Sequence, residues 1–415
     1  MRFQVFSIGK WHAAIAATGI FLSVPGYAAD IFTLEVETGG NKGALGFASV
    51  PDLFDKLNAG GLRSIQGSYT DTSAANVNID YRGLPIQIVT AANNAAVQLS
   101  ISSLGITENF SAKPTRDGNL EDLSNFFKRD GGAIISALQK KLAETSPVDP
   151  IAGNPASLQS QMASSNFDQT FTAFATNIKA APATGGQQQE GNSGLMALGL
   201  RFGHYSQAGL TTQTVTLPLS YTYRGWGEGR QLTINMPLMY GKTEGAQIVQ
   251  GGLGMAYRHP INDNWALTPS LNVAASGSVD LGSVGAMTSA SLTSQYGFKF
   301  KDLDWSMGNM VGVYSTLKIK TKDYSYDPGI KNTIFRNGLM VSQPVTLAGQ
   351  KLAVEYAFIN TQFNGTALYN KWTNEFSITL GTSKASNLPS YLRAGITILR
   401  GQQSKGTTLN VGYWF

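Results

Sequence analysis

The chain has 415 residues, no cysteine and three histidines, and its 31 basic and 26 acidic residues give a net charge of +5. The absence of thiols excludes a disulfide framework, a lipid-anchored cysteine and thiolate metal sites, and the small charge does not indicate nucleic-acid binding. The sequence contains no clustered metal-ligand spacing, phosphate-binding loop or dinucleotide fingerprint, and neither His204 nor His259 has an evident catalytic partner. We therefore expect no cofactor, no nucleic-acid partner and no enzymatic activity.

Residues 1–28 have the three regions of a secretory signal peptide. Arg2 and Lys10 give the positive region, residues 13–24 are apolar but too few to span a membrane, and Gly26 and Ala28 are small residues before the expected cut. The alternative is a short buried helix. Removing the segment leaves 29 basic and 26 acidic residues, a net charge of +3. No later run supplies the roughly 20 apolar residues of a membrane helix, so any membrane span must be a β-barrel.

Residues 29–110 predict a small α/β domain. A strand is expected at 31–36, and Ser49 can cap a short helix that has Pro51 in its first turn. Alternation predicts further strands around 77–81 and 97–101. We expect this domain in the periplasm, as a plug or a docking unit.

Residues 111–182 predict a helical plug or linker region. Its last helix is expected to begin near residue 154 and to carry one apolar stripe at i, i+4, i+7 and i+11 spacing. The stripe consists of Phe167, Phe171, Phe174 and Ile178. It can pack in the core of its own domain, or it can lie in or under a barrel mouth as a plug. Residues 183–193, ATGGQQQEGNS, then predict a flexible linker.

Residues 194–415 predict an all-β transmembrane barrel of 12 antiparallel strands. Apolar and polar residues alternate, most clearly in TVTLPLSYTY at 214–223. The apolar faces end in aromatic residues, as membrane-interface girdles require, and the polar faces carry small residues that suit a wet lumen better than a sandwich core. The predicted strands are 194–206, 210–224, 230–243, 246–259, 264–276, 282–300, 303–320, 330–344, 350–362, 367–381, 389–400 and 406–415.

The last strand, TTLNVGYWF, sharpens this prediction. Leu409, Val411, Tyr413 and Phe415 share one face, and Phe415 is the terminal residue. The strand resembles the signature that the barrel-assembly machinery reads in bacterial outer-membrane proteins. The expected partners are therefore this machinery and outer-membrane lipid with lipopolysaccharide. The C-terminus is expected to face the periplasm, and an even strand count then predicts the N-terminal region on that side too.

The same orientation assigns loops and lumen charges. The loops expected outside are 207–208, 243–245, 277–282, 321–331, 364–365 and 402–406. Most are short, so a gate is expected from the periplasmic side. The charged residues expected in the lumen are Arg224, Arg258, Glu355, Glu375 and Arg393. They can tune selectivity, or they can lie among headgroups or pair with one another across the wall.

Three runs in the barrel are similar to a known family. LTPSLNVAASGSVDLGSVGAMTSASLTSQYGF at 267–298, GNMVGVYSTL at 308–317 and KNTIFRNGL at 331–339 resemble the outer-membrane pore of Fap-type functional-amyloid secretion systems. The resemblance implies a 12-stranded, homotrimeric export pore with a helical plug, which secretes unfolded amyloid subunits. The N-terminal part departs from the family. The family carries a periplasmic coiled coil there, whereas this chain has no sustained heptads and a predicted α/β domain in that place.

Three functions remain open from the sequence. The first is an outer-membrane export pore for an unfolded polypeptide, gated by its own N-terminal region. The second is a passive or substrate-specific uptake porin for small solutes. The third is an autotransporter-like chain with residues 29–180 as its passenger, which ranks last because that passenger is short and lacks a repeated β-helix pattern.

Overall fold

Alternating side chains build two antiparallel sheets, an open sheet of six strands and a closed barrel of 12. The computed structural model describes residues 30–129, 131–171, 194–224, 227, 229–320, 325–382 and 391–414. The predicted signal peptide at 1–28 and the linker at 183–193 lie outside these residues, as do Phe174, Ile178 and Phe415.

The open sheet forms the N-terminal domain, with strand order β2-β1-β3-β4-β5-β6. Alternate residues of β1, including Phe32, Leu34 and Val36, are fully buried against the domain's helices. The Arg82–Gly83 turn predicted from the sequence joins β3 to β4, and both residues have positive φ, as type I′ hairpin turns require. The strands are β1 Phe32–Thr38, β2 Asn41–Phe47, β3 Ala75–Tyr81, β4 Leu84–Thr90, β5 Ala96–Ile101 and β6 Ile106–Ser111.

Four helices complete this domain. Ser49 caps α1, because its hydroxyl accepts a hydrogen bond from the amide of Asp52. Leu123 of α3 and Leu142 of α4 join the hydrophobic core of the sheet. The predicted helical region therefore divides, and its first two helices belong to the N-terminal domain. The helices are α1 Val50–Phe54, α2 Ala59–Ile65, α3 Arg116–Arg129 and α4 Gly131–Thr145, with 3-10 turns η1 Ala92–Asn94 and η2 Ser102–Leu104.

The barrel closes where β20 pairs with β7, and its 12 strands confirm the predicted fold. Tight turns at Ala208–Gly209, Glu244–Gly245 and Ala348–Gly349 have positive φ at both residues. The strands are β7 Gly194–Gln207, β8 Leu210–Tyr223, β9 Gln231–Thr243, β10 Ala246–Pro260, β11 Trp265–Ser278, β12 Ser283–Phe300, β13 Leu303–Leu317, β16 Lys331–Leu347, β17 Gln350–Gly365, β18 Trp372–Thr382, β19 Tyr391–Gly401 and β20 Ser404–Trp414. The short strands β14 Ile319–Lys320 and β15 Ser325–Tyr326 lie between β13 and β16.

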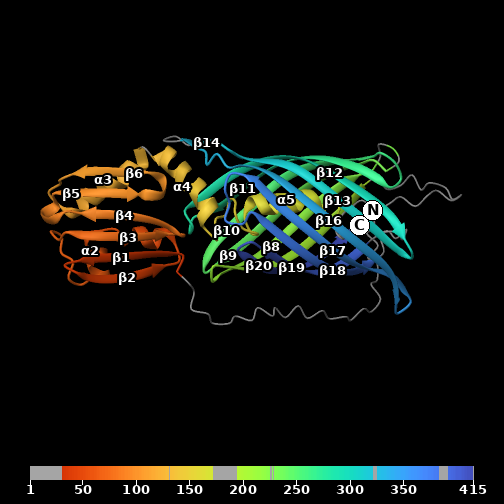
Figure 1. Cartoon of the computed structure of the whole chain (residues 1–415), viewed down its shortest axis with the longest axis horizontal. Coiled ribbons are helices and arrows are strands. Elements are labelled where there is room, and N and C mark those ends of the chain that lie inside the picture. Colours follow the sequence, from red (N-terminus) through yellow and green to blue (C-terminus); the bar gives the residue numbers. More distant parts are fainter. Residues whose placement is uncertain are drawn as a thin grey trace, which may run out of the picture.

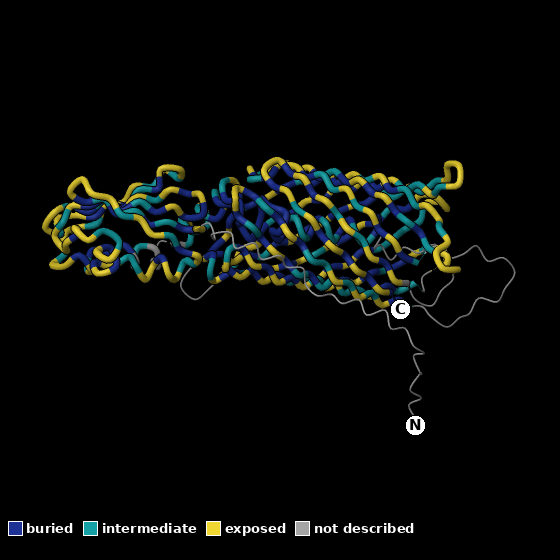
Figure 2. Tube along the Cα trace, turned by 90° about the horizontal axis from the view of Figure 1, so that it is seen from below, coloured by how far each residue is buried: buried dark blue, intermediate teal, exposed yellow. Residues whose placement is uncertain are grey.

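The outside of the barrel is apolar. Buried and exposed residues alternate along its strands, as Figure 2 shows, and the exposed ones include Val249, Leu271 and Phe358 at 60, 59 and 50%. Because a closed barrel pairs its backbone internally, it can present such a surface to lipid. The fold and its surface are those of an outer-membrane β-barrel. Among the described residues, no helix is long and apolar enough to cross a membrane.

The N-terminal domain lies against the barrel end opposite Trp414, the last described residue (Figure 1). The amide of Val50 donates to the carbonyl of Asp280 at 2.7 Å, and the Tyr81 hydroxyl donates to that of Leu281 at 3.4 Å. The predicted position at the same end as the barrel's C-terminus is therefore wrong. An even strand count places the start of β7 at the barrel end that carries Trp414. It does not determine the position of the N-terminal domain, because residues 146–171 enter the lumen from the opposite end.

Candidate functional site

A stretch of the chain's own backbone and side chains occupies the barrel lumen. We call residues 146–171 the lumen segment; it consists of an extended loop at 146–157, helix α5 at Leu158–Asp168 and a final turn at 169–171. Three prolines and Gly153, which has a φ of 96°, keep the first part non-helical. Figure 1 shows α5 inside the barrel.

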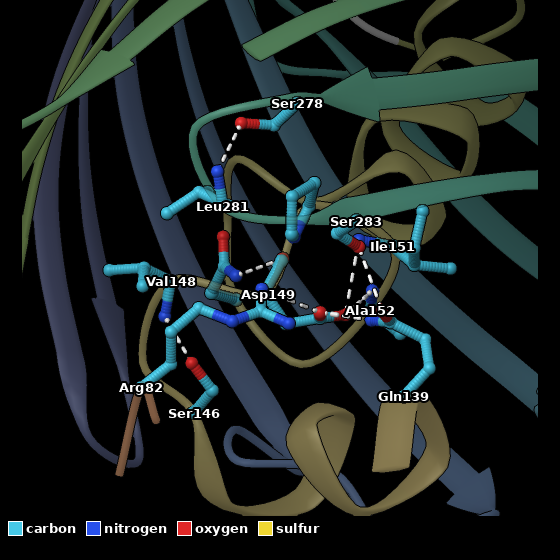
Figure 3. Close-up of polar contacts among 12 residues, drawn as sticks. Arg82, Gln139, Ser146, Val148, Asp149, Ile151, Ala152, Ser278, Leu281 and Ser283 are labelled. Carbon is cyan, nitrogen blue, oxygen red and sulfur yellow. Dashed lines mark hydrogen bonds and ion pairs between the residues drawn. The ribbon is translucent and has the colours of Figure 1, made fainter. Parts of the chain in front are cut away.

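Asp149 organises the loop where it enters the barrel (Figure 3). Its carboxylate accepts hydrogen bonds from the amides of Ile151 and Ala152 at 3.1 and 3.0 Å and from the side chain of Gln139, and it pairs with Arg82 at 3.3 Å. Both charged side chains are fully buried, so the N-terminal domain and the lumen segment form one polar junction.

The barrel wall holds the end of α4 and the loop through further hydrogen bonds. Ser283 of β12 donates to Gln139 at 2.8 Å, and Gln250 of β10 donates to the carbonyl of Ala156 at 2.9 Å. In the loop between β17 and β18, the amide of Asn370 donates to the carbonyl of Gly153 at 3.0 Å. The loop is therefore attached to strands on different sides of the barrel.

Helix α5 packs its apolar side on the wall formed by β11, β12, β13 and β16. Phe167 and Phe171 are fully buried, with ring centroids 4.8 Å apart. The Phe171 ring lies on Gly308 and Gly338, which face each other across β13 and β16, and a Cβ on either glycine would collide with it. Two members of the predicted stripe thus lie in the lumen, inside the barrel rather than below it.

The polar side of α5 bonds to β13 and also to two strands outside the apolar wall, β9 and β7. Asn166 donates to the Tyr314 hydroxyl at 2.9 Å, and Ser165 accepts from Asn235 at 3.0 Å. Asp168 pairs with Arg201 of β7 at 2.6 Å. Together with the apolar contacts, these bonds attach the helix to β7, β9, β11, β12, β13 and β16.

Three of the predicted lumen charges take part in buried ion pairs. Glu355 pairs with Arg393 at 2.7 Å, and Glu375 pairs with Arg336 at 3.0 Å. The guanidinium of Arg336 also lies 5.4 Å from the centre of the Phe167 ring. The sequence left open whether the predicted lumen charges tune selectivity, lie among headgroups or form pairs. These three form ion pairs.

The other predicted residues lie near the Trp414 end or on the outside. Arg258 donates to the carbonyl of Gly229 at 2.6 Å, and Arg224 follows β8 and is partly buried. Leu409, Val411 and Tyr413 point outward and are exposed. Their proposed role as an assembly signal stays a prediction.

Sequence reasoning missed two charged lumen residues, Arg201 and Arg336. Both alternate with outward apolar residues, Leu200 before Arg201 and Phe335 before Arg336. The alternation that located Glu355 could therefore have found them. Asp168, the partner of Arg201, could not be found in this way, because it lies on α5 and not on a strand. Alternation predicts Glu375 in the lumen, but it does not predict that Glu375 pairs with Arg336.

No family model and no curated protein matches the chain. Among solved structures, the β domain of the Bordetella autotransporter BrkA is 13% identical and covers 54% of this chain and 99% of its own, with a TM-score of 0.45. The translocator domain of the autotransporter NalP from Neisseria meningitidis is 12% identical, with coverages of 55 and 90% and a TM-score of 0.40. The KdgM porin in complex with disordered oligogalacturonate is 10% identical, with coverages of 53 and 98% and a TM-score of 0.34. The likeness concerns the barrel fold alone.

Proposed function

We propose that this protein is a plugged outer-membrane barrel that carries its own N-terminal domain across the membrane and holds it at the cell surface. The observation that carries the proposal is the path of the lumen segment, which links a domain at one barrel mouth to strands that begin and end at the other. With the Trp414 end in the periplasm, as expected for a terminal barrel strand, the domain lies outside.

The contacts of the lumen segment support a tether rather than a transient cargo. Asp149 is fully buried together with Arg82, and Phe171 has a socket built from two wall glycines. A buried charge without its partner, or a space in the wall without the side chain that fills it, would lower the stability of the fold. The wall and the segment are therefore adapted to each other, as expected for a permanent occupant of the lumen.

An export pore for a separate polypeptide, gated from the periplasm, fits this arrangement less well. Such a gate requires the N-terminal domain at the Trp414 end. The strand number agrees with the Fap-type resemblance, whereas amyloid cargo and a homotrimer stay predictions of that resemblance.

A second candidate is a gated channel for small solutes. Two cavities of about 140 and 60 Å³ flank α5 and favour this function. A passive uptake porin in the present conformation is disfavoured, because α5 and its side chains occupy the lumen.

Membrane sidedness tests the main proposal. The chain has no cysteine, so single thiols can be introduced by Ser103→Cys in the N-terminal domain and by Asp302→Cys in the turn between β12 and β13; both sites are exposed. Intact cells are treated with a bulky, membrane-impermeant maleimide. We expect Ser103→Cys to react in intact cells and Asp302→Cys to react only after the outer membrane is permeabilised. The reverse pattern would contradict surface display and would indicate that the N-terminal domain lies in the periplasm.

A further inference from the structure

A cavity of about 140 Å³ separates part of the lumen wall from α5, which packs on β11, β12, β13 and β16. At a single level of the barrel, each of six neighbouring strands presents one small or cyclic residue to this cavity. In strand order from β20 through β7 to β11, they are Gly412, Gly199, Pro218, Pro237, Gly252 and Ala274, called the glycine–proline row below.

The glycine–proline row interrupts the barrel's own pairing. Pairing of β7 with β8 lapses between Leu198–Leu219 and Arg201–Thr216, which brackets Pro218. Pairing of β9 with β10 lapses between Leu238–Gly251 and Asn235–Gly254, which brackets Pro237. Proline cannot donate to the ladder and is normally kept out of interior strands. Two facing prolines inside a barrel thus sacrifice local stability, which is typical of functional positions.

One polar group beside the cavity lacks a partner. Thr216 lines the cavity, and its hydroxyl has no hydrogen bond among the described residues although the residue is only 8% exposed. Buried polar atoms are normally satisfied, so this hydroxyl calls for an explanation.

The remaining surroundings define the chemistry of an occupant. Leu158 and Met162 of α5 face the row across the cavity. The charged residues at its edge, Asp168 and Arg201, already pair with each other, so neither offers a free charge to a ligand. An elongated, uncharged molecule with an aliphatic body and hydrogen-bonding groups matches this lining.

We propose that the cavity binds an uncharged aliphatic amphiphile, such as a medium-chain alcohol. Its chain lies between α5 and the glycine–proline row, and its hydroxyl forms a hydrogen bond with the Thr216 hydroxyl. The inference goes beyond surface display and holds for either orientation of the barrel in the membrane.

The test uses a medium-chain aliphatic alcohol that carries a diazirine. Full-length protein is placed in detergent-free lipid nanodiscs and irradiated, and labelled peptides are located by mass spectrometry. We expect labelling of Leu158, Met162 or the glycine–proline row, and competition by the unlabelled alcohol. Labelling confined to outward residues, or labelling that does not compete, would overturn the proposal.

Thr216→Val supplies the matched variant, because it removes the hydroxyl and keeps the shape. We expect about a tenfold weaker competition constant, the effect of one lost hydrogen bond in a water-poor cavity. Thr293→Val is the control, since the Thr293 hydroxyl is also buried and unpartnered but lies in β12 outside the cavity. Retained heat-modifiability on gels checks that each variant folds. Equal constants for Thr216→Val and the unchanged protein would contradict the proposed site.

Discussion

The lumen charges are arranged as pairs that reach over an intervening strand. Glu355 lies on β17 and Arg393 on β19, and their side chains meet above β18. Gly381 of β18 makes this possible, because a Cβ at that position would lie 2.6 Å from the Arg393 side chain. A pair so deeply buried compensates each charge for the water it loses.

Glu355→Gln tests the strength of this pair. The variant leaves the Arg393 guanidinium buried without its countercharge, and we expect a loss of about 3 kcal/mol in unfolding free energy. The measurement is the temperature at which the barrel loses its heat-modifiable gel mobility. Asp304→Asn is the matched control, because Asp304 and Lys299 are 3.7 Å apart with side chains 54 and 82% exposed, and such pairs contribute little. Equal shifts of this temperature in Glu355→Gln and Asp304→Asn would contradict a stabilising role for the buried Glu355–Arg393 pair.

Individual lumen residues were only partly predictable from the sequence. Alternation predicts Glu355 and Glu375 on the polar face of their strands, and both side chains take part in lumen ion pairs. It does not predict which side chains these residues pair with. The same holds for Arg201, which bonds to Asn410, 209 residues away, because only closure of the barrel brings β7 and β20 together.

The lumen segment depends on close fit more than on its own helical propensity. Phe171 occupies space that two opposed glycines leave free, and Ile151 occupies the space above Gly285 in the same manner. Interiors packed in this way respond to a single added side chain.

Gly338→Val is expected to loosen the plug. The new side chain collides with the Phe171 ring, and overpacking of this kind costs about 1–3 kcal/mol. We expect the full-length variant to open more often in planar lipid bilayers, with longer conducting periods than the unchanged protein. Gly277→Val is the control, since a Cβ at Gly277 meets nothing within 4 Å. If both variants conduct like the unchanged protein, Phe171 does not hold the plug in place.

Whole elements were predicted more completely than their positions. All 12 barrel strands follow from alternation, because each strand has a lipid face and a lumen face of opposite polarity. The stripe that contains Phe167 and Phe171 is predicted, but the sequence leaves open whether it packs in a domain core or lies in or under the barrel mouth. An apolar helix face fits a domain core and a glycine-lined barrel wall equally well, and the wall exists only after the barrel closes.

The molecule as a whole is a domain, a tether and a barrel in that order along the chain, folded so that the tether runs inside the barrel. The Arg82–Asp149 pair joins the domain to the tether, and Ser283 joins the same cluster to the barrel. The position of the domain could not be derived from strand parity, because parity describes the barrel alone. Because residues 146–171 run inside the lumen, the domain lies at the barrel end opposite to the one that parity predicts.

Occupancy of the lumen by residues 146–171 is tested most directly by a designed disulfide in the assembled protein. The Cγ1 atom of Ile151 lies 3.1 Å from the position of a Cβ on Gly285, close to the geometry that a disulfide needs. The variant combines Ile151→Cys with Gly285→Cys in a chain that has no other cysteine. The control combines Ile151→Cys with Thr222→Cys, at the Trp414 end of the barrel.

Both variants are assembled in cells that lack the periplasmic disulfide oxidase, and a mild oxidant is added to isolated membranes. Peptide mass spectrometry without reduction then reports the linkage. We expect a disulfide between positions 151 and 285 in most molecules, and free thiols in the control. Free thiols at 151 and 285 in a correctly assembled, heat-modifiable barrel would contradict a lumen filled by the chain's own segment.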